Sequence, residues 1–459
     1  MATHGLREFN FRNSVKVCQE QRGAGKKPMK DEWRTRIGNS DKLPKGMVEF
    51  DGKRYLDGRA SDPGELGWMR GAPPSADKRI TFESDTFLEF PKIRWALSHM
   101  RELTATVNVW RGAYLSSRLQ GDDRTVDIDA LTFTDTTGRE RRFDEALIDT
   151  YTDGILVLHR GRVAYERYFG ALAPHLPHAC NSITKSYAGT LAAALVCEGV
   201  LDDTKTIPHY LPELRGTAWD DATLRQVMDM QMGLAYTESY AESTSSVWEY
   251  ARAAGWRPRS NDEQGTQTCA DYLRSIKKAG VHGEAFAYKS VNTEVMAWVM
   301  ARVTGRSFAQ LLSERLWAPL GCEEDGYMIV DSAGMPMAGA GLSATLRDMA
   351  RFGELMRREG EWNGKQLIPA SVVHDLQKAD HSLKFPLMGY NYSYRSQWWM
   401  THNELDAIEA RGIHGQRLYI APKAEMVIAR FCSHPIASAA LSDPITMPQM
   451  FALGQMLLR

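Results

Sequence analysis

The chain has 459 residues, of which 43% are hydrophobic, 10% aromatic and 25% charged. These are the values of a globular protein of two or three domains, and they exclude a wholly disordered, collagen-like or membrane-embedded chain. The 56 basic and 57 acidic side chains leave a formal net charge of −1. This balance argues against nucleic acid as the main partner, because a phosphate backbone requires clustered cations.

The cysteines and the N-terminus predict a cellular location. Six cysteines are scattered without a C-x-x-C pair or zinc-finger spacing, so we expect no metal site and a reducing compartment. The first residues lack the apolar run of a secretory signal, and no stretch reaches the ~18 apolar residues of a membrane helix. We therefore expect a cytoplasmic protein that contacts no membrane and uses no cofactor.

The N-terminal region is predicted to be irregular. Residues 1–46 carry eleven Lys/Arg and five Asp/Glu with poor periodicity. We interpret them as an arm or strap over the domain surface, with a basic docking tail as the alternative. Residues 47–105 read as irregular structure with short strands.

Strand signals strengthen from Val107 onward. Residues 128–134 and 140–143 flank a Thr137-Gly138 turn, and Asp144 can cap a short helix. Residues 155–159 and 163–168 form a second predicted hairpin around Arg160-Gly161. Because Ile155–Leu158 is apolar on both faces, we expect this strand to be central.

Helical patterns follow, and then strands return. The spacing predicts helices over 183–195, 292–303, 308–316 and 349–356, a hairpin of 418–420 with 426–431, and a closing helix over 451–458. This order predicts an α+β protein with an antiparallel sheet flanked by helices and an inserted, mainly helical domain. The predicted parts are an arm and irregular segment over 1–105, a sheet domain over 106–190 and 330–459, and a helical domain over 191–329.

The strongest chemical signal lies at the start of the first long helix. Ser182 and Lys185 form an S-x-x-K pattern and lie one helical turn apart. A serine hydroxyl becomes a good nucleophile when a base takes its proton, and a lysine with a lowered pKa can be that base. Residues 75–78 and 275–278 match the pattern too, but they lack the strand–loop–helix setting. A serine cap with a solvated lysine is the alternative interpretation of the pattern alone.

Two downstream segments support nucleophilic catalysis. Tyr288 supplies a phenol two residues before Ser290, and a phenol can act as a base or relay a proton to a leaving group. Residues 412–416 contain Gly412 and Gly415 and precede a predicted strand. A main-chain N–H there can complete an oxyanion hole with the N–H of Ser182.

Together, Asn181–Lys185, Tyr288–Ser290 and His414–Gln416 resemble the serine β-lactamase-fold hydrolases. This superfamily includes class C β-lactamases, D,D-peptidases and esterases, and the nearest resemblance is to the nylon-oligomer (6-aminohexanoate-dimer) hydrolases. The likeness covers roughly residues 60–433. It implies a β-lactamase/penicillin-binding-protein-like fold and a serine hydrolase that forms an acyl-enzyme.

The resemblance also implies roles for individual residues. It implies that Ser182 is acylated and that Lys185 and Tyr288 exchange its proton. Tyr240 would donate a hydrogen bond to the substrate or leaving group from a mobile loop. The N–H groups of Ser182 and Ile413 would form the oxyanion hole. A lid over residues 233–268 is implied as well. The residues implied to bind substrate are Trp256 of that lid, Trp399 of the pocket wall, Gly339, His414 and Ser290.

Some positions depart from the family pattern. His414 stands near the position where penicillin-recognising enzymes carry the lysine of their K-T-G motif. This difference argues against a β-lactam carboxylate as ligand. Ala251 and Gly339 stand where an acidic residue and an asparagine are associated with nylon-dimer activity. We therefore expect an esterase or amidase for a small acyl substrate, with oligomeric state, including a homodimer, left open. The alternatives are a β-lactamase or D,D-peptidase, and a catalytically silent module that binds a peptide or wall fragment.

Overall fold

The computed structural model describes residues 43–113, 115–259, 267–379, 385–387 and 390–459. Most of the basic arm and residues 260–266 of the expected lid therefore lie outside the described residues.

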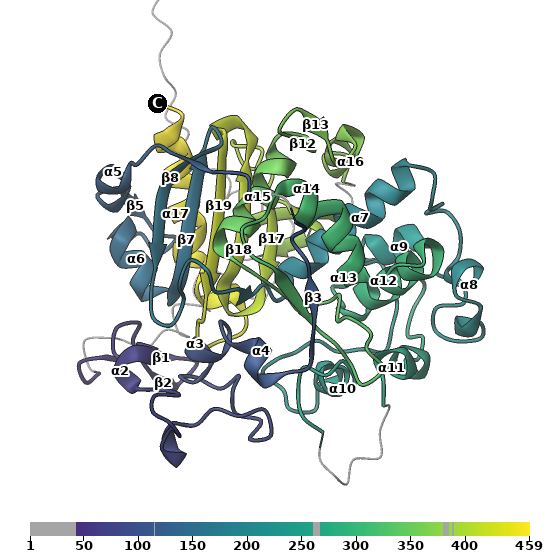
Figure 1. Ribbon diagram of the computed structural model, residues 1–459, viewed down its shortest axis with the longest axis horizontal. Helices are drawn as coiled ribbons and strands as arrows, with labels where there is room; N and C mark the ends of the chain where they lie inside the picture. The colour runs from purple at the N-terminus through teal and green to yellow at the C-terminus, as the bar shows by residue number, and fades with distance from the viewer. Residues whose placement is uncertain (1–42, 114, 260–266, 380–384, 388–389) are drawn as a thin grey trace, which may run out of the picture.

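A nine-stranded sheet forms the centre of one half of the molecule (Figure 1). Its order is β14-β15-β16-β17-β18-β19-β7-β8-β4, and all neighbours are antiparallel except the edge pair β4 and β8. The strands are β4 (Gln120–Gly121), β7 (Thr152–His159), β8 (Arg162–Tyr168), β14 (Phe385–Leu387), β15 (Tyr390–Arg395), β16 (Trp398–Met400), β17 (Ile408–Gly412), β18 (Gln416–Ala421) and β19 (Met426–Cys432). Strands from both ends of the chain thus share one sheet, as the sequence predicted.

Strand β7 lies inside the sheet, between β19 and β8, and is buried along its whole length. Leu156 and Leu158 belong to the large core that includes helices α7 (Ile183–Cys197) and α15 (Leu346–Arg357). Ile155 and Val157 belong to a second core on the other face, which includes α17 (Asp443–Leu457). Because side chains alternate along a strand, two covered faces explain the continuous apolar run.

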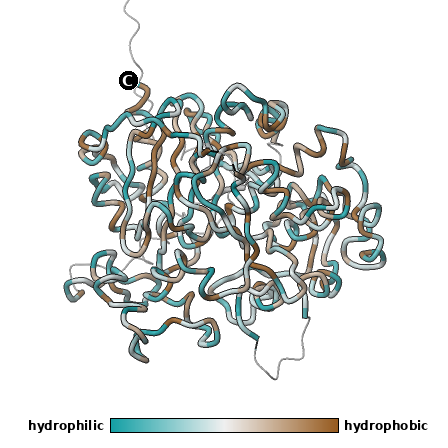
Figure 2. The backbone as a smooth tube through the Cα atoms, in the orientation of Figure 1, coloured by the Kyte–Doolittle hydropathy of each residue, from teal (hydrophilic) through white to brown (hydrophobic). Residues whose placement is uncertain are grey.

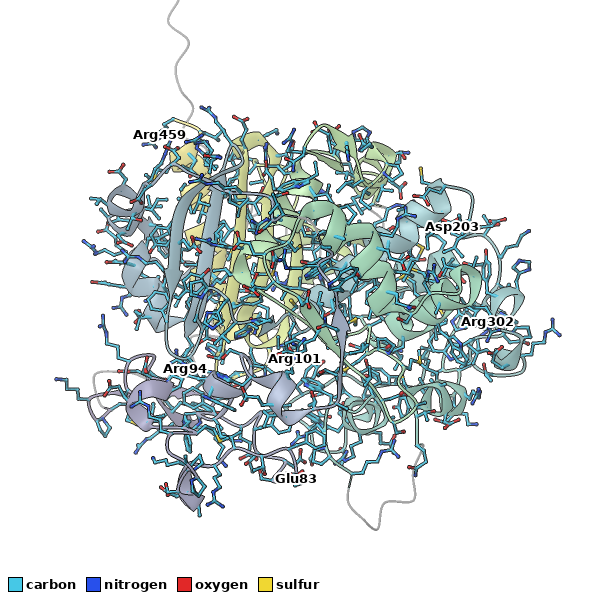
Figure 3. All side chains as sticks on the ribbon, in the orientation of Figure 1. Glu83, Arg94, Arg101, Asp203, Arg302 and Arg459 are labelled. Atoms are coloured by element: carbon cyan, nitrogen blue, oxygen red, sulfur yellow. The ribbon has the colours of Figure 1, made fainter. Side chains whose placement is uncertain are left out.

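Helices fill the other half of the molecule. They are α8 (Ile207–Tyr210), α9 (Leu224–Met228), α10 (Ser246–Ala253), α11 (Cys269–Ser275), α12 (Val291–Thr304), α13 (Phe308–Leu312) and α14 (Ala318–Leu320). A π-helical turn over Ser313–Trp317 joins α13 to α14, so the helical path runs on to Leu320 rather than stopping near 316. Figure 3 shows charged side chains such as Asp203 and Arg302 at the rim of this half.

A second, four-stranded sheet has the order β3-β10-β11-β9. Its strands are β3 (Thr106–Val109), β9 (His178–Ala179), β10 (Gly326–Ile329) and β11 (Leu342–Ala344). Helix α7 crosses residue 190 and β10 ends at residue 329, the two positions where domain boundaries were expected. Hydrophobic segments run through the strands and inner helices of both halves (Figure 2).

The remaining α-helices and β-strands are short. They are β1 (Met47–Phe50), β2 (Lys53–Leu56), α2 (Pro63–Leu66), α3 (Ile93–Ala96), α4 (Met100–Leu103), α5 (Thr125–Asp129), β5 (Thr132–Thr134), β6 (Glu140–Arg142), α6 (Phe143–Asp149), β12 (Glu361–Trp362), β13 (Lys365–Gln366) and α16 (Ala370–Leu376). The expected strand over 128–134 is wrong at its start. Ile128 lies in α5 and packs into the second core, so only residues 132–134 pair with β6.

Candidate active site

Ser182 lies in the short connection between β9 and α7. Two backbone hydrogen bonds hold the approach to it, from Ala179 N to Leu97 O (2.7 Å) and from Cys180 N to Leu342 O (2.8 Å). Asn181 then takes a left-handed conformation with φ of 48°. Such a φ is uncommon for a residue with a side chain, and it turns the chain so that Ser182 stands at the start of α7.

Lys185 lies one turn along α7 and is 1% exposed. Its Nζ lies 2.8 Å from Ser182 Oγ and 2.6 Å from the carbonyl oxygen of Gly339. Burial lowers the pKa of Lys185 to about 8, although the carboxylates of Glu238 and Glu294 act in the opposite direction. A neutral amine here can donate one N–H to Gly339 and accept the Ser182 proton through its lone pair.

Tyr288 precedes α12 and brings a phenol to the same place. It makes a polar interaction with Ser182, and Lys185 Nζ lies 5.0 Å from the centre of its ring. Burial, and then the charge of Glu238, raise the pKa of Tyr288, so the phenol keeps its proton. Trp399 stacks on it with ring centres 5.6 Å apart, which fixes the ring in an aromatic cluster with Tyr394 and Phe286.

The two main-chain N–H groups expected to bind an oxyanion belong to Ser182 and Ile413. Within the described part of the chain, neither donates a hydrogen bond to a protein acceptor. Asn181 Nδ2 donates to the carbonyl oxygen of Ile413 (3.2 Å), and Gln416 Nε2 donates to the same oxygen (3.1 Å). These bonds tie the β17–β18 turn to the residue before the nucleophile.

A carboxylate that the sequence reasoning missed lies at the same site. Glu238 accepts hydrogen bonds from Ser290 N (2.6 Å), Ser290 Oγ (2.7 Å) and Tyr240 Oη (3.1 Å). Glu238 therefore joins Tyr240 and Ser290, and its charge also raises the pKa of the Tyr288 phenol. No local pattern marks Glu238, because its partner Ser290 lies 52 residues further along the chain.

Gly339 is near the site through its backbone. Its carbonyl binds Lys185, and its N–H donates to Glu294, a second carboxylate that the sequence reasoning missed (2.7 Å). Two expected substrate-binding residues, His414 and Trp256, are buried. The imidazole of His414 faces the carbonyl oxygen of His434 (2.7 Å), and Trp256 is 4% exposed in the large core. Within the described residues, no hydrogen bond or ring contact joins either side chain to Ser182.

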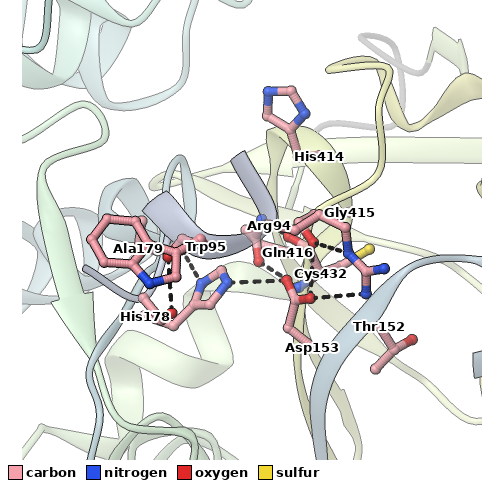
Figure 4. Close-up of polar contacts among 12 residues, drawn as sticks. Arg94, Trp95, Thr152, Asp153, His178, Ala179, His414, Gly415, Gln416 and Cys432 are labelled. Atoms are coloured by element: carbon pink, nitrogen blue, oxygen red, sulfur yellow. Dashed lines mark hydrogen bonds and ion pairs between the residues drawn. The ribbon is translucent and has the colours of Figure 1, made fainter. Parts of the chain in front are cut away.

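A buried polar network supports the approach to the nucleophile (Figure 4). Asp153 on β7 lies 3.3 Å from His178 Nε2 and 3.5 Å from Arg94 Nη2, and it accepts a hydrogen bond from Ser433 (2.8 Å). Arg94 also donates to the carbonyl of Gly58 (2.7 Å), so it joins the N-terminal segment to the sheet (Figure 3). His178 lies four residues before Ser182, whereas His414 points away from this network in Figure 4.

Comparison with known proteins places the chain in a family. The family model described as Beta-lactamase matches residues 141–443. A 6-aminohexanoate-dimer hydrolase of Paenarthrobacter ureafaciens is 34% identical over 356 residues, which is 76% of this chain and 88% of that protein. The chain therefore belongs to the beta-lactamase family.

Solved structures agree with this assignment. A structure described as a candidate 6-aminohexanoate-dimer hydrolase from Bacillus anthracis matches 84% of this chain and 99% of its own, with 33% identity and a TM-score of 0.77. A family VIII carboxylesterase matches 69% of this chain and 95% of its own at 16% identity and a TM-score of 0.52, which shows the shared fold. The protein is a β-lactamase-fold hydrolase related to the 6-aminohexanoate-dimer hydrolases. The fold expected from the resemblance is confirmed.

Proposed function

We propose that the protein is a serine hydrolase that cleaves a small ester or amide through an acyl-enzyme on Ser182. The observation that carries the proposal is the 2.8 Å separation of Lys185 Nζ from Ser182 Oγ, at a lysine whose pKa burial lowers to about 8. A base must lie within hydrogen-bond reach of the proton that it takes, and its pKa should lie near the working pH.

Acylation follows from these positions. Lys185 takes the Ser182 proton as Oγ forms a bond to the substrate carbonyl carbon. The N–H groups of Ser182 and Ile413 stabilise the negative charge that develops on the carbonyl oxygen. The bond to the leaving alcohol or amine then breaks, and Tyr288 gives its proton to that group and regains one from Lys185.

Deacylation uses the same residues in reverse. A water molecule gives its proton to the Lys185–Tyr288 pair as it attacks the acyl carbon, and Ser182 recovers its proton when the ester bond breaks. Tyr240 and Ser290, which both donate hydrogen bonds to Glu238, would border the region that the leaving group occupies. They would act with the Trp399 face of the aromatic cluster to orient the substrate.

The charges at the site favour this reaction over β-lactam recognition. The Glu238 carboxylate holds both polar hydrogens of Ser290, and it would repel a carboxylate on the substrate. A catalytically silent binding module is disfavoured as well, since the nucleophile, the amine and the phenol lie together. Hydrolysis of nitrocefin as fast as that of p-nitrophenyl acetate would favour the β-lactamase alternative.

The proposal is tested by pre-steady-state hydrolysis of p-nitrophenyl acetate. Wild-type protein should release a burst of p-nitrophenol that approaches one equivalent, and Ser182→Ala should release none while it keeps its far-UV circular dichroism. A burst that persists in Ser182→Ala would contradict the proposal. A panel of short-chain esters, amides and lactams would then define the acyl group.

The expected location and assembly remain proposals. Among the described residues, no helix has the length and apolar character needed to cross a bilayer. The five described cysteines are free thiols. Chromatography with light scattering would test the homodimer.

A further inference from the structure

Glu294 is a buried carboxylate behind the proposed base, and the reaction described above gives it no role. It lies on α12 and is 0% exposed. Its oxygens accept hydrogen bonds from Ala338 N (2.9 Å) and Gly339 N (2.7 Å) and from the phenol of Tyr250. A buried charge is costly unless it is well bonded, so such a carboxylate fixes the 338–339 backbone firmly.

The fixed backbone accepts a hydrogen bond from Lys185, the proposed base. The carbonyl oxygen of Gly339 lies 2.6 Å from Lys185 Nζ. If Lys185 is a neutral amine, this acceptor takes one of its two N–H groups and leaves the lone pair directed at Ser182 Oγ. The carbonyl thus orients the amine, as a third group orients the base in other nucleophilic sites.

We propose that Glu294, together with Tyr250, is a positioning residue that aims the Gly339 carbonyl at Lys185 and thereby orients the general base. The inference rests on the proposed serine-hydrolase function. It adds a link between the site and α10, the helix that carries Tyr250. A movement of α10 would therefore change the position of Lys185 through the Glu294 carboxylate and the Gly339 peptide.

Glycine at position 339 is a consequence of this arrangement. A Cβ at residue 339 would lie 2.7 Å from Tyr250 Oη and 2.9 Å from Glu294 Oε1. Real Cβ atoms do not approach so closely, so the phenol and the carboxylate fill the space that a side chain would need. Residue 339 is therefore a glycine because the groups that hold its backbone against Lys185 leave no room for a side chain.

The charges around this group determine what its removal does. Glu294 faces Lys185, Tyr250, Tyr236 and the buried thiol of Cys269, and Lys185 also faces Glu238 and Tyr288. Among these groups, Glu294 and Glu238 favour the protonated form of Lys185. Loss of the Glu294 charge should therefore lower the pKa of Lys185 further.

The test is the pH dependence of inactivation by a fluorophosphonate, which reports the base in the free enzyme. Glu294→Gln should move the midpoint of the profile down by about 1 pH unit. The plateau rate should fall by about tenfold, because the amide has one accepting oxygen and can no longer hold both Ala338 N and Gly339 N. Glu354→Gln is the matched control, since it removes another buried carboxylate, bonded to Arg357 on α15, and should leave the profile unchanged. A Glu294→Gln profile with the wild-type midpoint would overturn the proposal, whatever the plateau.

A second set of variants avoids dependence on one substitution. Gly339→Ala should slow inactivation strongly in the wild-type background and less in the Tyr250→Phe background, because the shortest of its new contacts is then gone. Simple additivity of the two losses would contradict the link. Labelling of Ser182→Ala by the fluorophosphonate would show instead that the proposed function is wrong.

Discussion

Lys185 Nζ donates to the carbonyl oxygen of Gly339 at 2.6 Å, although 154 residues separate the two in sequence. One side of the amine is therefore bound by a fixed acceptor, and the other lies 2.8 Å from Ser182 Oγ. The helix α7 supplies the spacing of Ser182 and Lys185, while the 338–339 backbone supplies the orientation. This pair of contacts leads to the first prediction.

Lys185→Met should lose acylation and gain stability. Without the amine nothing takes the Ser182 proton, so the acylation rate should fall by at least ~10²-fold. Methionine leaves no buried amine to desolvate, so the melting temperature at pH 7 should rise. The measurements are burst kinetics and calorimetry, and Thr190→Ser on the same helix is a matched control that keeps the hydroxyl bonded to the Ser186 carbonyl. An acylation rate in Lys185→Met within threefold of wild type would rule out the lysine as base.

The acylation rate should rise with pH through a midpoint near 8, because only the neutral form of Lys185 accepts a proton. Stability should follow the same group. The unfolded chain binds a proton on this lysine up to its ordinary pKa of 10.5, whereas the folded chain releases it near 8. The unfolded state therefore holds more protons between these values, and this group makes folding more favourable as pH rises through that window.

Denaturant unfolding at several pH values from 7.5 to 10.5 measures this contribution, with Lys185→Met as reference. The difference in unfolding free energy between wild type and variant should change in favour of the wild type as pH rises. A difference that stays constant with pH would show that burial does not lower the pKa of this lysine.

Ile413→Pro should remove one oxyanion donor. Ile413 follows the extended residue Gly412 and begins a short 3-10 turn, a position where the backbone of proline fits. The variant keeps the chain path but lacks the N–H, and kcat should fall by about 10²–10³. Ile413→Val keeps the N–H and is the matched control. Equal activity in the two variants would show that the Ile413 N–H does not stabilise the oxyanion.

Gly189→Ala should destabilise the protein through α7. A Cβ at this position would lie 2.1 Å from the carbonyl oxygen of Ser396 and 2.7 Å from the Cβ of Gln397. The helix that carries the nucleophile would have to move away from the β15–β16 turn, at a cost of about 2–3 kcal/mol. Gly121→Ala, where a Cβ meets nothing within 4 Å, is the control. Urea unfolding of both variants measures the difference, and equal stability would contradict the close packing.

The sequence predicted the parts of the site that follow local patterns. The S-x-x-K pattern placed Ser182 and Lys185 on one helix face, and α7, α12 and α15 lie within a few residues of their expected ranges. Tyr288 was a candidate because it supplies a phenol two residues before Ser290, and the combined resemblance then supported its role, since a tyrosine before a helix cap is not distinctive alone. The site roles assigned to these residues stay predictions until they are measured.

Other features could not be read from the sequence. Glu238 and Glu294 act through residues that are 52 and 45 positions away, and such pairs leave no periodic signal. The end of α5 was expected to begin a strand because residues 128–134 precede the Thr137-Gly138 turn, whereas Ile128 lies in the helix and packs into the second core. His414 was placed at the site by analogy, and its left-handed φ of 62° turns its imidazole toward His434.

Covalent modification of Ser182 is measured most directly by mass spectrometry of the protein after treatment with a fluorophosphonate or an activated ester. We expect one adduct per chain, on the peptide that contains Ser182, and none in Ser182→Ala. An adduct on any other residue, or an unmodified Ser182 in protein that still hydrolyses the ester, would contradict it.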